Sequence, residues 1–338
     1  MSDTPPGRRL GESLQSKFLI GLNTVVLAVT GKQPRVLTVS PQISELSKSA
    51  ASYSSPVTLH SLPSGSFDGE NDRTLELCLR RSVVEQTNNE LGYVEQLYTF
   101  ADQGRDHRER SRGARVLSVG YLALAQESGM AAAKHSSWEN CFDYLPWEDW
   151  RDGRPEIMDG IESALHQWAK DRKDLLERIE ICFGSGNAGW DAYKVLERYE
   201  LLYEAQMISE FWLDHGQPVE HLICQRLGHP MAFDHRRILA TGLGRVRGKL
   251  RYRPLIFEMI PETFTLLHLQ QVAEALTGLR LKKQNFRRQV EHSGLVEGTG
   301  DLEQKTGGRP AELFRFRRAV LRERRAPGMT TLHWSRDA

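Results

Sequence analysis

The sequence predicts an α+β body followed by a C-terminal winged helix-turn-helix, and three observations lead to that prediction. The first 150 residues alternate apolar, β-branched stretches with one short amphipathic stretch. Residues 155–240 place apolar residues at the three-and-four spacing of helices. Residues 245–325 hold 18 Lys and Arg against 9 Asp and Glu, whereas the remainder holds 27 against 35. A basic segment on an acidic body indicates a module that meets nucleic acid or another acidic surface.

Length and composition narrow the class of protein. The chain has 338 residues and a net charge of +1, which is room for more than one domain. Four widely spaced cysteines form no CxxC pair, so we expect reduced thiols and not a zinc site. No apolar run approaches the roughly 20 residues of a membrane span, and the N-terminus lacks the apolar core of a signal peptide. We therefore expect a cytoplasmic protein that does not bind membranes.

The strands and the helix of the body follow in order. Residues 1–16 are polar and rich in Pro and Gly, so a flexible lead-in is expected before a domain at 17–150. "FLIGLNTVVLAV" and "RVLTVS", separated by the turn "TGKQP", predict a hairpin. "LELCLRRSVVEQT" (75–87) predicts an amphipathic helix, and "GYVEQLYTF" and "VLSVGYLALA" predict two more strands.

Residues 151–243 are predicted to form a helical extension. "MDGIESALHQWAKDRKDLLERIEICF" and "AYKVLERYELLYEAQMISEFW" both have helical spacing, and the second is broadly apolar and aromatic. Two interpretations of these apolar and aromatic residues stay open at this point. The helices pack within their own domain, or they form the interface of a homodimer.

Residues 244–325 carry the order of elements of a winged helix, with 326–338 as a tail. "TLLHLQQVAEAL" predicts a helix with Thr265 as its N-cap and Gly278 just past its end. After a tight turn, "LKKQNFRRQVEHSG" predicts a second helix that buries Phe286 and Val290, which lie four residues apart. "GLVEGTGDLEQKTGGRPAELFRFRR" then predicts strand, Gly-rich loop and strand. Helix, turn, helix and hairpin wing together predict a winged helix-turn-helix.

The outward face of the second helix predicts that it reads double-stranded DNA. Gln284, Asn285 and Arg288 have the paired hydrogen-bonding groups that distinguish base edges in the major groove. Lysines and arginines supply affinity for phosphates. A small helical domain with a solvated basic face is the alternative. The residues predicted to contact DNA are Thr265, Lys282, Lys283, Gln284, Asn285, Arg287, Arg288 and Arg309.

The front of the chain, "LPSGSFDGENDRTLELCLRRSVVEQTNNELGYVEQLYTFADQGRD", resembles the segment of Nudix proteins that spans the Nudix box. The resemblance implies an Arg-Glu-x-x-Glu-Glu helix whose carboxylates bind Mg²⁺ for pyrophosphate cleavage. Its motif falls on Arg81, Ser82, Glu85 and Gln86, with further departures at Arg73 and Asn88. One carboxylate of three is too few for a hard cation. We therefore expect neither a metal site nor catalysis, and Glu85 also has a plain interpretation as a surface acid.

Both halves together resemble the Nudix-related transcriptional regulators of NAD metabolism, the NrtR-like proteins. "EQLYTFADQGRD", "GYLAL", "RVRGKLRYRPLIFEMIPETFTL", "NFRRQVEHSGLVE" and "GGRPAELFRF" carry this resemblance, over residues of roughly 60–130 and 240–320. The helical stretch and "FDYLPWEDWRDGRP" are more similar to the NadQ branch. The resemblance implies a Nudix-like N-terminal domain and a dimeric repressor of NAD biosynthesis genes on a near-palindromic operator. It also implies an adenine nucleotide effector, ATP first and NAD or ADP-ribose next, with no required cofactor. Relatives often have an acidic N-cap where Lys282 stands.

A nucleotide site is also consistent with the residues themselves. "DQGRDHRERSRGAR" offers cationic donors for phosphates beside two strands, and "DYLPWEDW" offers aromatic rings for stacking, including Tyr144 and Trp150. Packing on the surface or in the core is the alternative for each of them. The candidate effector-binding residues are Arg81, Arg105, His107, Arg108, Arg115 and Trp147.

Two other classes of function stay open at this stage. One is an active Nudix pyrophosphohydrolase with an appended nucleic-acid module, and the other is an RNA-binding or architectural protein with no effector. A coupling element between sensor and winged helix is expected at "DHRRILATGLGRVRGKLRY" (234–252). Gly242, Gly244 and Gly248 weaken this helical pattern by roughly 1 kcal/mol each relative to Ala. The stretch is therefore either a hinge or a linker whose glycines permit close packing.

Overall fold

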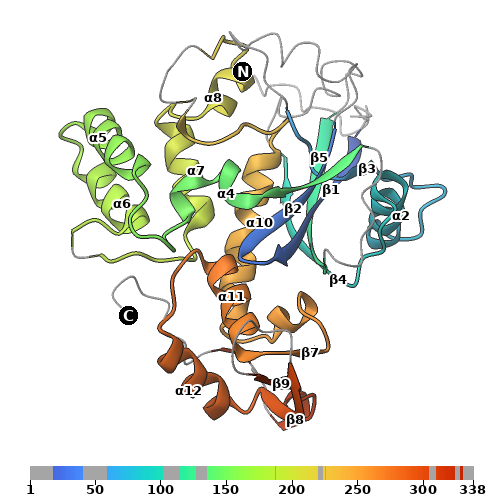
Figure 1. Cartoon of the computed structure of the whole chain (residues 1–338). Helices are drawn as coiled ribbons and strands as arrows, with labels where there is room; N and C mark the ends of the chain where they lie inside the picture. Colours follow the sequence, from blue (N-terminus) through green and yellow to red (C-terminus); the bar gives the residue numbers. More distant parts are fainter. Residues whose placement is uncertain are drawn as a thin grey trace, which may run out of the picture.

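The computed structural model describes residues 18–40, 59–101, 115–126, 135–186, 188–219, 224, 226–303, 310–323 and 328–329. Figure 1 shows a mixed sheet flanked by helices, with a smaller helical part and its own sheet below it. The α+β class predicted from the sequence is confirmed.

The larger sheet has the order β4-β5-β1-β2-β6, with β3 also pairing with β1. β1 (Phe18–Thr30) turns at Gly31 into the antiparallel β2 (Gln33–Val39), which is the predicted hairpin. β5 (Arg115–Leu124) runs parallel to β1, β4 (Tyr93–Phe100) runs antiparallel to β5, and β6 (Ser136–Asn140) runs antiparallel to β2. β3 is the short strand Ser64–Ser66. β1 lies between neighbours and is covered on both faces, so nine consecutive residues, 21–29, are buried without the alternation of a half-exposed strand.

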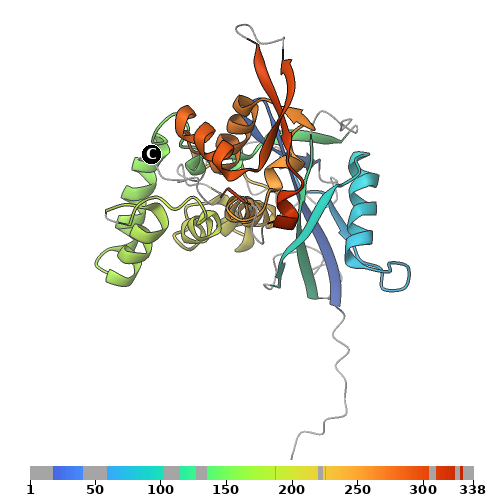
Figure 2. The ribbon, with the colours of Figure 1, turned by 90° about the horizontal axis from the view of Figure 1, so that it is seen from below.

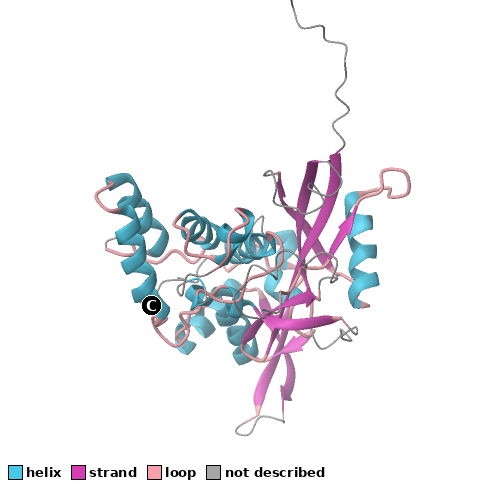
Figure 3. Cartoon of the chain, turned by 90° about the horizontal axis from the view of Figure 1, so that it is seen from above, coloured by secondary structure: helices cyan, strands magenta, loops and turns pink. Residues whose placement is uncertain are grey.

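Helices cover both faces of this sheet, as Figure 3 shows. α2 (Leu75–Thr87) packs on one face through Cys78, Leu79 and Val83, which are all buried beside residues of β1 and β5. α10 (His235–Leu250) packs on the other face, and its Ile238 and Leu243 belong to the largest buried cluster. We call the sheet with α2 and α10 the body.

The position of α10 corrects the predicted domain boundary and bears on the two interpretations of its glycines. The expected domain boundary between residues 243 and 244 falls inside this 16-residue helix, so α10 belongs to the body and is not a linker. A Cβ at Gly242 would lie 2.9 Å from Val25 Cγ1, and one at Gly244 would lie 3.2 Å from the Tyr193 carbonyl oxygen. Two of its glycines therefore serve close packing, which was one of the two interpretations held open.

Between β6 and α10 the chain forms a set of shorter helices. They are α4 (Cys141–Tyr144), η3 (Pro146–Glu148), α5 (Ile157–Ala169), α6 (Lys173–Phe183), α7 (Val195–Glu204) and α8 (Ser209–Asp214). Each long stretch of helical spacing in the sequence is thus divided in two. The breaks come at Lys170 and Gln206, whose positive φ angles of 51° and 60° end the preceding helical turns.

The C-terminal part has the predicted winged-helix order. η4 (Leu255–Glu258) and β7 (Thr263–Phe264) lead into α11 (Leu266–Thr277), and α12 (Lys283–Ser293) follows after a short turn. β8 (Val296–Glu303) and β9 (Ala311–Phe316) form an antiparallel hairpin that projects from the molecule in Figure 2, and α13 (Val320–Glu323) follows it. β7 pairs with β9, so this sheet has the order β7-β9-β8.

The described residues contain neither a membrane-spanning helix nor a cluster of metal ligands. None of their helices combines the length and apolar character needed to cross a membrane. No group of three or more of their His, Cys, Asp and Glu side chains is arranged to hold a metal ion. The four cysteines are free and buried.

Candidate nucleic-acid interface and effector region

α12 is anchored by the two apolar residues that the sequence singled out. Phe286 and Val290 are each 2% exposed and pack in the same buried cluster as Leu295. Gly294 ends the helix with a φ of 60°, a left-handed conformation in which glycine carries no steric cost. The predicted end of the helix is therefore confirmed, and its anchored face determines which residues point outward.

The outward residues of α12 form a polar face. Lys282, Lys283, Gln284, Asn285, Arg287 and Arg288 are all exposed. The Arg287 guanidinium donates to the Glu291 carboxylate at 2.8 Å, one helical turn further on. The other five side chains have no hydrogen-bonding or ion-pair partner among the residues that the structure describes. Their donors are available to a partner from outside the chain, which is what base and phosphate contacts require.

The remaining predicted DNA contacts have different surroundings. Thr265 caps α11, because its hydroxyl oxygen accepts the His268 amide at 3.1 Å, and the hydroxyl can still donate to a phosphate. Lys282 occupies the N-cap of α12 without a capping side-chain bond. A cation there opposes the helix dipole, so an external anion would be favoured beside it. Arg309 lies outside the described residues.

The turn between α11 and α12 is docked on residues 146–152, which we call the docking segment. The Trp150 amide donates to the Gly278 carbonyl at 2.7 Å, and the Arg280 guanidinium donates to the Arg151 carbonyl at 3.2 Å and to Asp152 at 2.8 Å. Gly278 has a φ of +71°, and a Cβ there would lie 2.1 Å from the Glu148 carbonyl oxygen. Only glycine therefore fits at this close approach, which places the turn before α12 against the docking segment.

A buried group of charges, which we call the arginine node, lies behind this contact. Glu148 pairs with Arg198 and Arg247, and all three side chains are 0% exposed. The Arg198 Nε to Glu148 Oε1 distance is 2.6 Å, and Arg247 also donates from Nε to the Leu276 carbonyl of α11 at 2.9 Å. Burial alone would raise the pKa of Glu148, but the two guanidiniums outweigh it and hold the pKa below its ordinary value. The node thus joins η3, α7 and α10 to the end of α11.

Sequence reasoning did not find this node. The one available signal was a glutamate between two tryptophans in "PWEDW", because an acid in an aromatic segment is rarely buried without a partner. Neither arginine partner is near Glu148 in the sequence. Only the packing of the helices brings the three together.

The helix that resembles a Nudix box uses its polar residues for packing. Ser82 is buried, and a Cβ at Gly65 would lie 2.2 Å from its hydroxyl oxygen. The Gln86 carboxamide accepts from the Ser64 amide at 3.1 Å and donates to the Ser64 carbonyl. A carboxylate could do the first but not the second. Both positions therefore fit the residues present and not the metal-binding glutamates of the motif.

Other residues of this helix also have structural partners. Arg81 forms an ion pair with Asp72, and its hydrogen bond holds the pKa of that carboxyl to about 2. Glu85 is 3.7 Å from Arg81 and its side chain is 65% exposed, which agrees with its plain interpretation as a surface acid. Asn88, at the position of the expected glycine, ends the helix at a φ of 55°. Its backbone N–H donates to the Val84 carbonyl. Asn tolerates this left-handed conformation better than most residues, so the turn is kept.

Of the predicted effector-binding residues, the structure describes three. Arg115 begins β5 and donates to the Ala101 carbonyl at 2.6 Å. Arg81 is engaged with Asp72. Trp147 is 0% exposed, with the Arg236 guanidinium 5.3 Å from its ring, so its burial contradicts a stacking role. The same holds for Tyr144 and Trp150, which are 1% and 6% exposed. Arg105, His107 and Arg108 lie outside the described residues.

Comparison with known proteins agrees with this geometry. The family model for the NrtR DNA-binding winged helix domain matches residues 256–316. A protein of Acinetobacter baylyi named the ADPR responsive transcriptional repressor NtrR is 41% identical over 259 residues, which is 75% of this chain and 68% of that protein. This chain belongs to the NrtR family of Nudix-related transcriptional regulators. The predicted resemblance and the winged helix are thereby confirmed.

Two solved structures are similar in fold to nearly the whole chain. The crystal structure of Shewanella oneidensis NrtR complexed with a 27mer DNA has a TM-score of 0.52 and 20% identity, over 92% of this chain and 95% of that one. A MutT/nudix family protein from Enterococcus faecalis has a TM-score of 0.50 and 16% identity, over 94% and 90%. The body is Nudix-like, and a winged-helix DNA-binding domain follows it.

Proposed function

We propose that this NrtR-family chain represses NAD biosynthesis genes and that its Nudix-like body senses an adenine nucleotide. The observation that carries the proposal is the outward face of α12, where five polar side chains have no partner among the described residues. Gln284, Asn285 and Arg288 are assigned to base edges, and Lys282 and Lys283 to phosphates. Thr265, Arg287 and Arg309 complete the proposed set.

ADP-ribose is the first effector to test, followed by ATP and NAD. The relative at 41% identity is named for its response to ADPR, whereas the sequence resemblance to the NadQ branch favoured ATP. Arg115 is the described residue that best suits a phosphate contact, because it is the first residue of β5, directly after the β4–β5 connection, and is partly exposed. Arg105, His107 and Arg108 of the same connection are proposed to act with it.

We infer that the body does not hydrolyse nucleotides. Ser82 and Gln86 stand where the box has two acids, neither carries a charge, and the Gln86 carboxamide is engaged by Ser64, so too few carboxylates are left for a hard cation. The competing function is a Nudix pyrophosphohydrolase with an appended nucleic-acid module. Turnover of ADP-ribose with Mg²⁺ at ordinary enzyme rates would favour that competitor.

The proposed domain arrangement follows the sequence with one amendment. Residues 17–150 together with α10 form the effector-binding body, α5 to α8 form a helical extension, and the winged helix runs from η4 to residue 325. The extension is proposed to take part in a cytoplasmic homodimer. A homodimer presents two α12 helices, and the near-palindromic operator follows from that symmetry.

Fluorescence anisotropy with labelled duplexes tests the proposal. We expect the full-length protein to bind a duplex from the promoter of an NAD biosynthesis gene far more tightly than a scrambled duplex, and ADP-ribose or ATP to change that affinity. An architectural or RNA-binding protein would bind all duplexes alike, or prefer RNA, with no effect of nucleotide. Either of those results would overturn the proposed function.

A further inference from the structure

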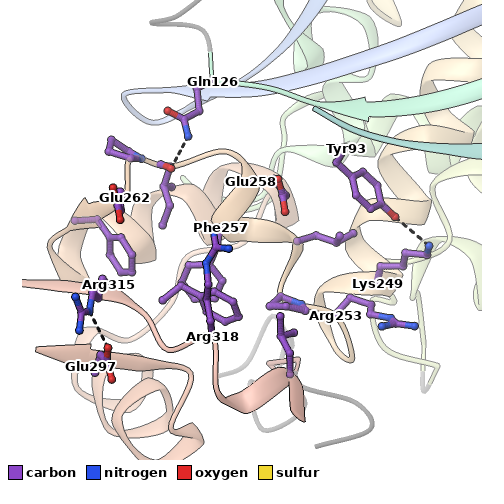
Figure 4. Close-up of a pocket in the computed structure, with 17 residues that line it drawn as sticks. Tyr93, Gln126, Lys249, Arg253, Phe257, Glu258, Glu262, Glu297, Arg315 and Arg318 are labelled. Carbon is purple, nitrogen blue, oxygen red and sulfur yellow. Dashed lines mark hydrogen bonds and ion pairs between the residues drawn. The ribbon is translucent and has the colours of Figure 1, made fainter. Parts of the chain in front are cut away.

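A cavity of about 970 Å³ lies between the body and the winged helix. Figure 4 shows that its lining comes from the start of β4, the end of α10, the segment around η4, and β8 and β9. This volume is at the upper end of the range for small-molecule sites. None of the residues proposed to contact DNA or the effector lines this cavity.

One side of the cavity is aromatic and apolar. Phe257 stacks on Phe316 with ring centroids 4.4 Å apart and an angle of 26°, and Phe264 lies 5.7 Å from Phe257. Tyr93 lines the opposite side and is half-buried. Such a surface suits the flat face of a ring.

Cations line the cavity from both parts of the chain. Lys249 and Arg253 come from the end of α10 and the turn after it, and Arg315 and Arg318 come from β9 and the turn that follows. Lys249 pairs with Glu95, and Arg315 pairs with Glu297 at 2.7 Å. Burial lowers the pKa of Lys249, and the nearby charge of Arg253 lowers it further.

Arg253 and Arg318 are exposed and have no ion-pair partner among the described residues. The same holds for two acids of the lining, Glu258 and Glu262. Figure 4 shows Arg253 beside Lys249 and Arg318 beside Phe257, so one arginine comes from the turn after α10 and the other from the turn after β9. The cavity therefore offers unused charges of both signs together with a surface for a ring.

We propose that this cavity binds a phosphorylated, ring-bearing metabolite of nucleotide size, with Arg253 and Arg318 on its phosphates. The ring lies against Phe257 and Tyr93, and Glu258 and Glu262 accept hydrogen bonds from sugar hydroxyls or ring amines. Guanidiniums suit phosphate because their N–H groups match its oxygens in pairs. An occupant held by both arginines ties the winged helix to the body.

This site is separate from the proposed effector region. β4 has eight residues, with Tyr93 at its first position and the β4–β5 connection after its last. At about 3.3 Å per residue, the two sites are roughly 25 Å apart along the strand. A photolabel or a mutation at one site can therefore be distinguished from one at the other site.

Photoaffinity labelling of the full-length protein tests the proposal. 2-Azido-ATP and 2-azido-ADP-ribose are the probes, and labelled tryptic peptides are identified by mass spectrometry. We expect label on peptides from residues 249–264 or 310–323. The proposed effector region predicts label on peptides around residues 101–115 instead, so each site has its own readout. Absence of label from both junction peptides, with either probe, would overturn the proposal whether or not the effector region is labelled.

Matched variants supply the second arm. Arg253→Gln and Arg318→Gln should each weaken binding of the junction-labelling nucleotide by about tenfold or more, because each removes a charge-assisted hydrogen bond. Arg251→Gln and Arg322→Gln are the controls, since both arginines are exposed, lie close in sequence to the test residues and do not line the cavity. Equal binding by test and control variants in calorimetry would refute the roles of the two arginines.

Discussion

Replacing Glu148 by Gln should be among the most destabilising polar substitutions in this protein. The change keeps the size of the side chain but removes the only negative charge of the arginine node. Arg198 and Arg247 would then remain fully buried without a counter-charge. The new carboxamide also turns one acceptor into a donor that faces guanidinium N–H groups.

The magnitude follows from burial. Removing one partner of a buried ion pair costs about 3–5 kcal/mol, because the remaining charge stays desolvated. Unfolding free energies of proteins are about 5–15 kcal/mol, so this loss is a large share of the total. Glu204→Gln is the matched control, since Glu204 and Arg178 form a similar two-bond pair on the surface, with side chains 44% and 37% exposed. Surface pairs contribute about 0–1 kcal/mol.

Urea unfolding followed by far-ultraviolet circular dichroism measures both variants. We expect a much lower midpoint for Glu148→Gln at an unchanged slope, and a midpoint near that of the unmodified protein for Glu204→Gln. Equal midpoints for the two variants would refute the reasoning. That result would mean that solvent or rearranged carbonyls compensate the arginines.

The pH dependence of the unfolding free energy gives an independent check that Glu148 is charged in the folded protein. The folded-state pKa of Glu148 is held below its ordinary value, so the unfolded chain binds more protons than the folded one as the pH falls. The stabilisation from Glu148 is therefore complete above the unfolded pKa of about 4.3 and is lost below it. The difference in unfolding free energy between the unmodified protein and Glu148→Gln should shrink as the pH falls below that value. A difference that stays constant to pH 3 would contradict the assignment.

Three further predictions can be checked with the same preparations. Arg288→Ala should cost about 1–3 kcal/mol on the specific operator and reduce discrimination, whereas Lys283→Ala should weaken all duplexes and lower the salt slope by about one; identical behaviour in anisotropy titrations would show that the roles are misassigned. Gly242→Ala should destabilise by about 1–3 kcal/mol, because its Cβ would lie 2.9 Å from a Val25 methyl group, whereas Gly248→Ala meets open space and should stabilise by up to about 1 kcal/mol. Thermal unfolding distinguishes these opposite signs. Gln86→Glu should lower stability by about 1–3 kcal/mol, since it loses the bond to the Ser64 carbonyl, and should not give ADP-ribose turnover; a stable variant that hydrolyses ADP-ribose would contradict this.

Local sequence patterns predicted the helices well because the start, end and buried face of a helix depend on residues only a few positions apart in the chain. Thr265 and Gly278 mark the ends of α11, and Phe286 and Val290 mark the buried face of α12, all within a few residues. The layer to which an element belongs is a different matter. α10 lies between a helical stretch and a basic module in the sequence, yet it covers the sheet that begins more than 200 residues earlier.

Residue roles were harder to predict than elements because they depend on burial. Trp147 and an exposed stacking tryptophan look the same in the sequence. Trp147 is 0% exposed, and its guanidinium neighbour, Arg236, comes from α10, almost 90 residues further along the chain. Periodicity identifies which face of a helix is apolar but does not identify what packs against it. The same limit hid the partners of Glu148.

The position of the arginine node also changes where coupling between sensor and DNA-binding domain should be sought. α10 is one continuous helix packed on the sheet, so bending it would disturb the core of the body. The docking segment, in contrast, contacts the turn that starts the recognition helix, through the Trp150 amide on Gly278 and the Arg280 guanidinium on Arg151 and Asp152. A Cβ at Gly278 would lie 2.1 Å from the Glu148 carbonyl oxygen, so a movement of the docking segment toward the turn would collide with it. Coupling between the body and α12 should therefore be sought at residues 146–152, in contacts that need no bend in α10.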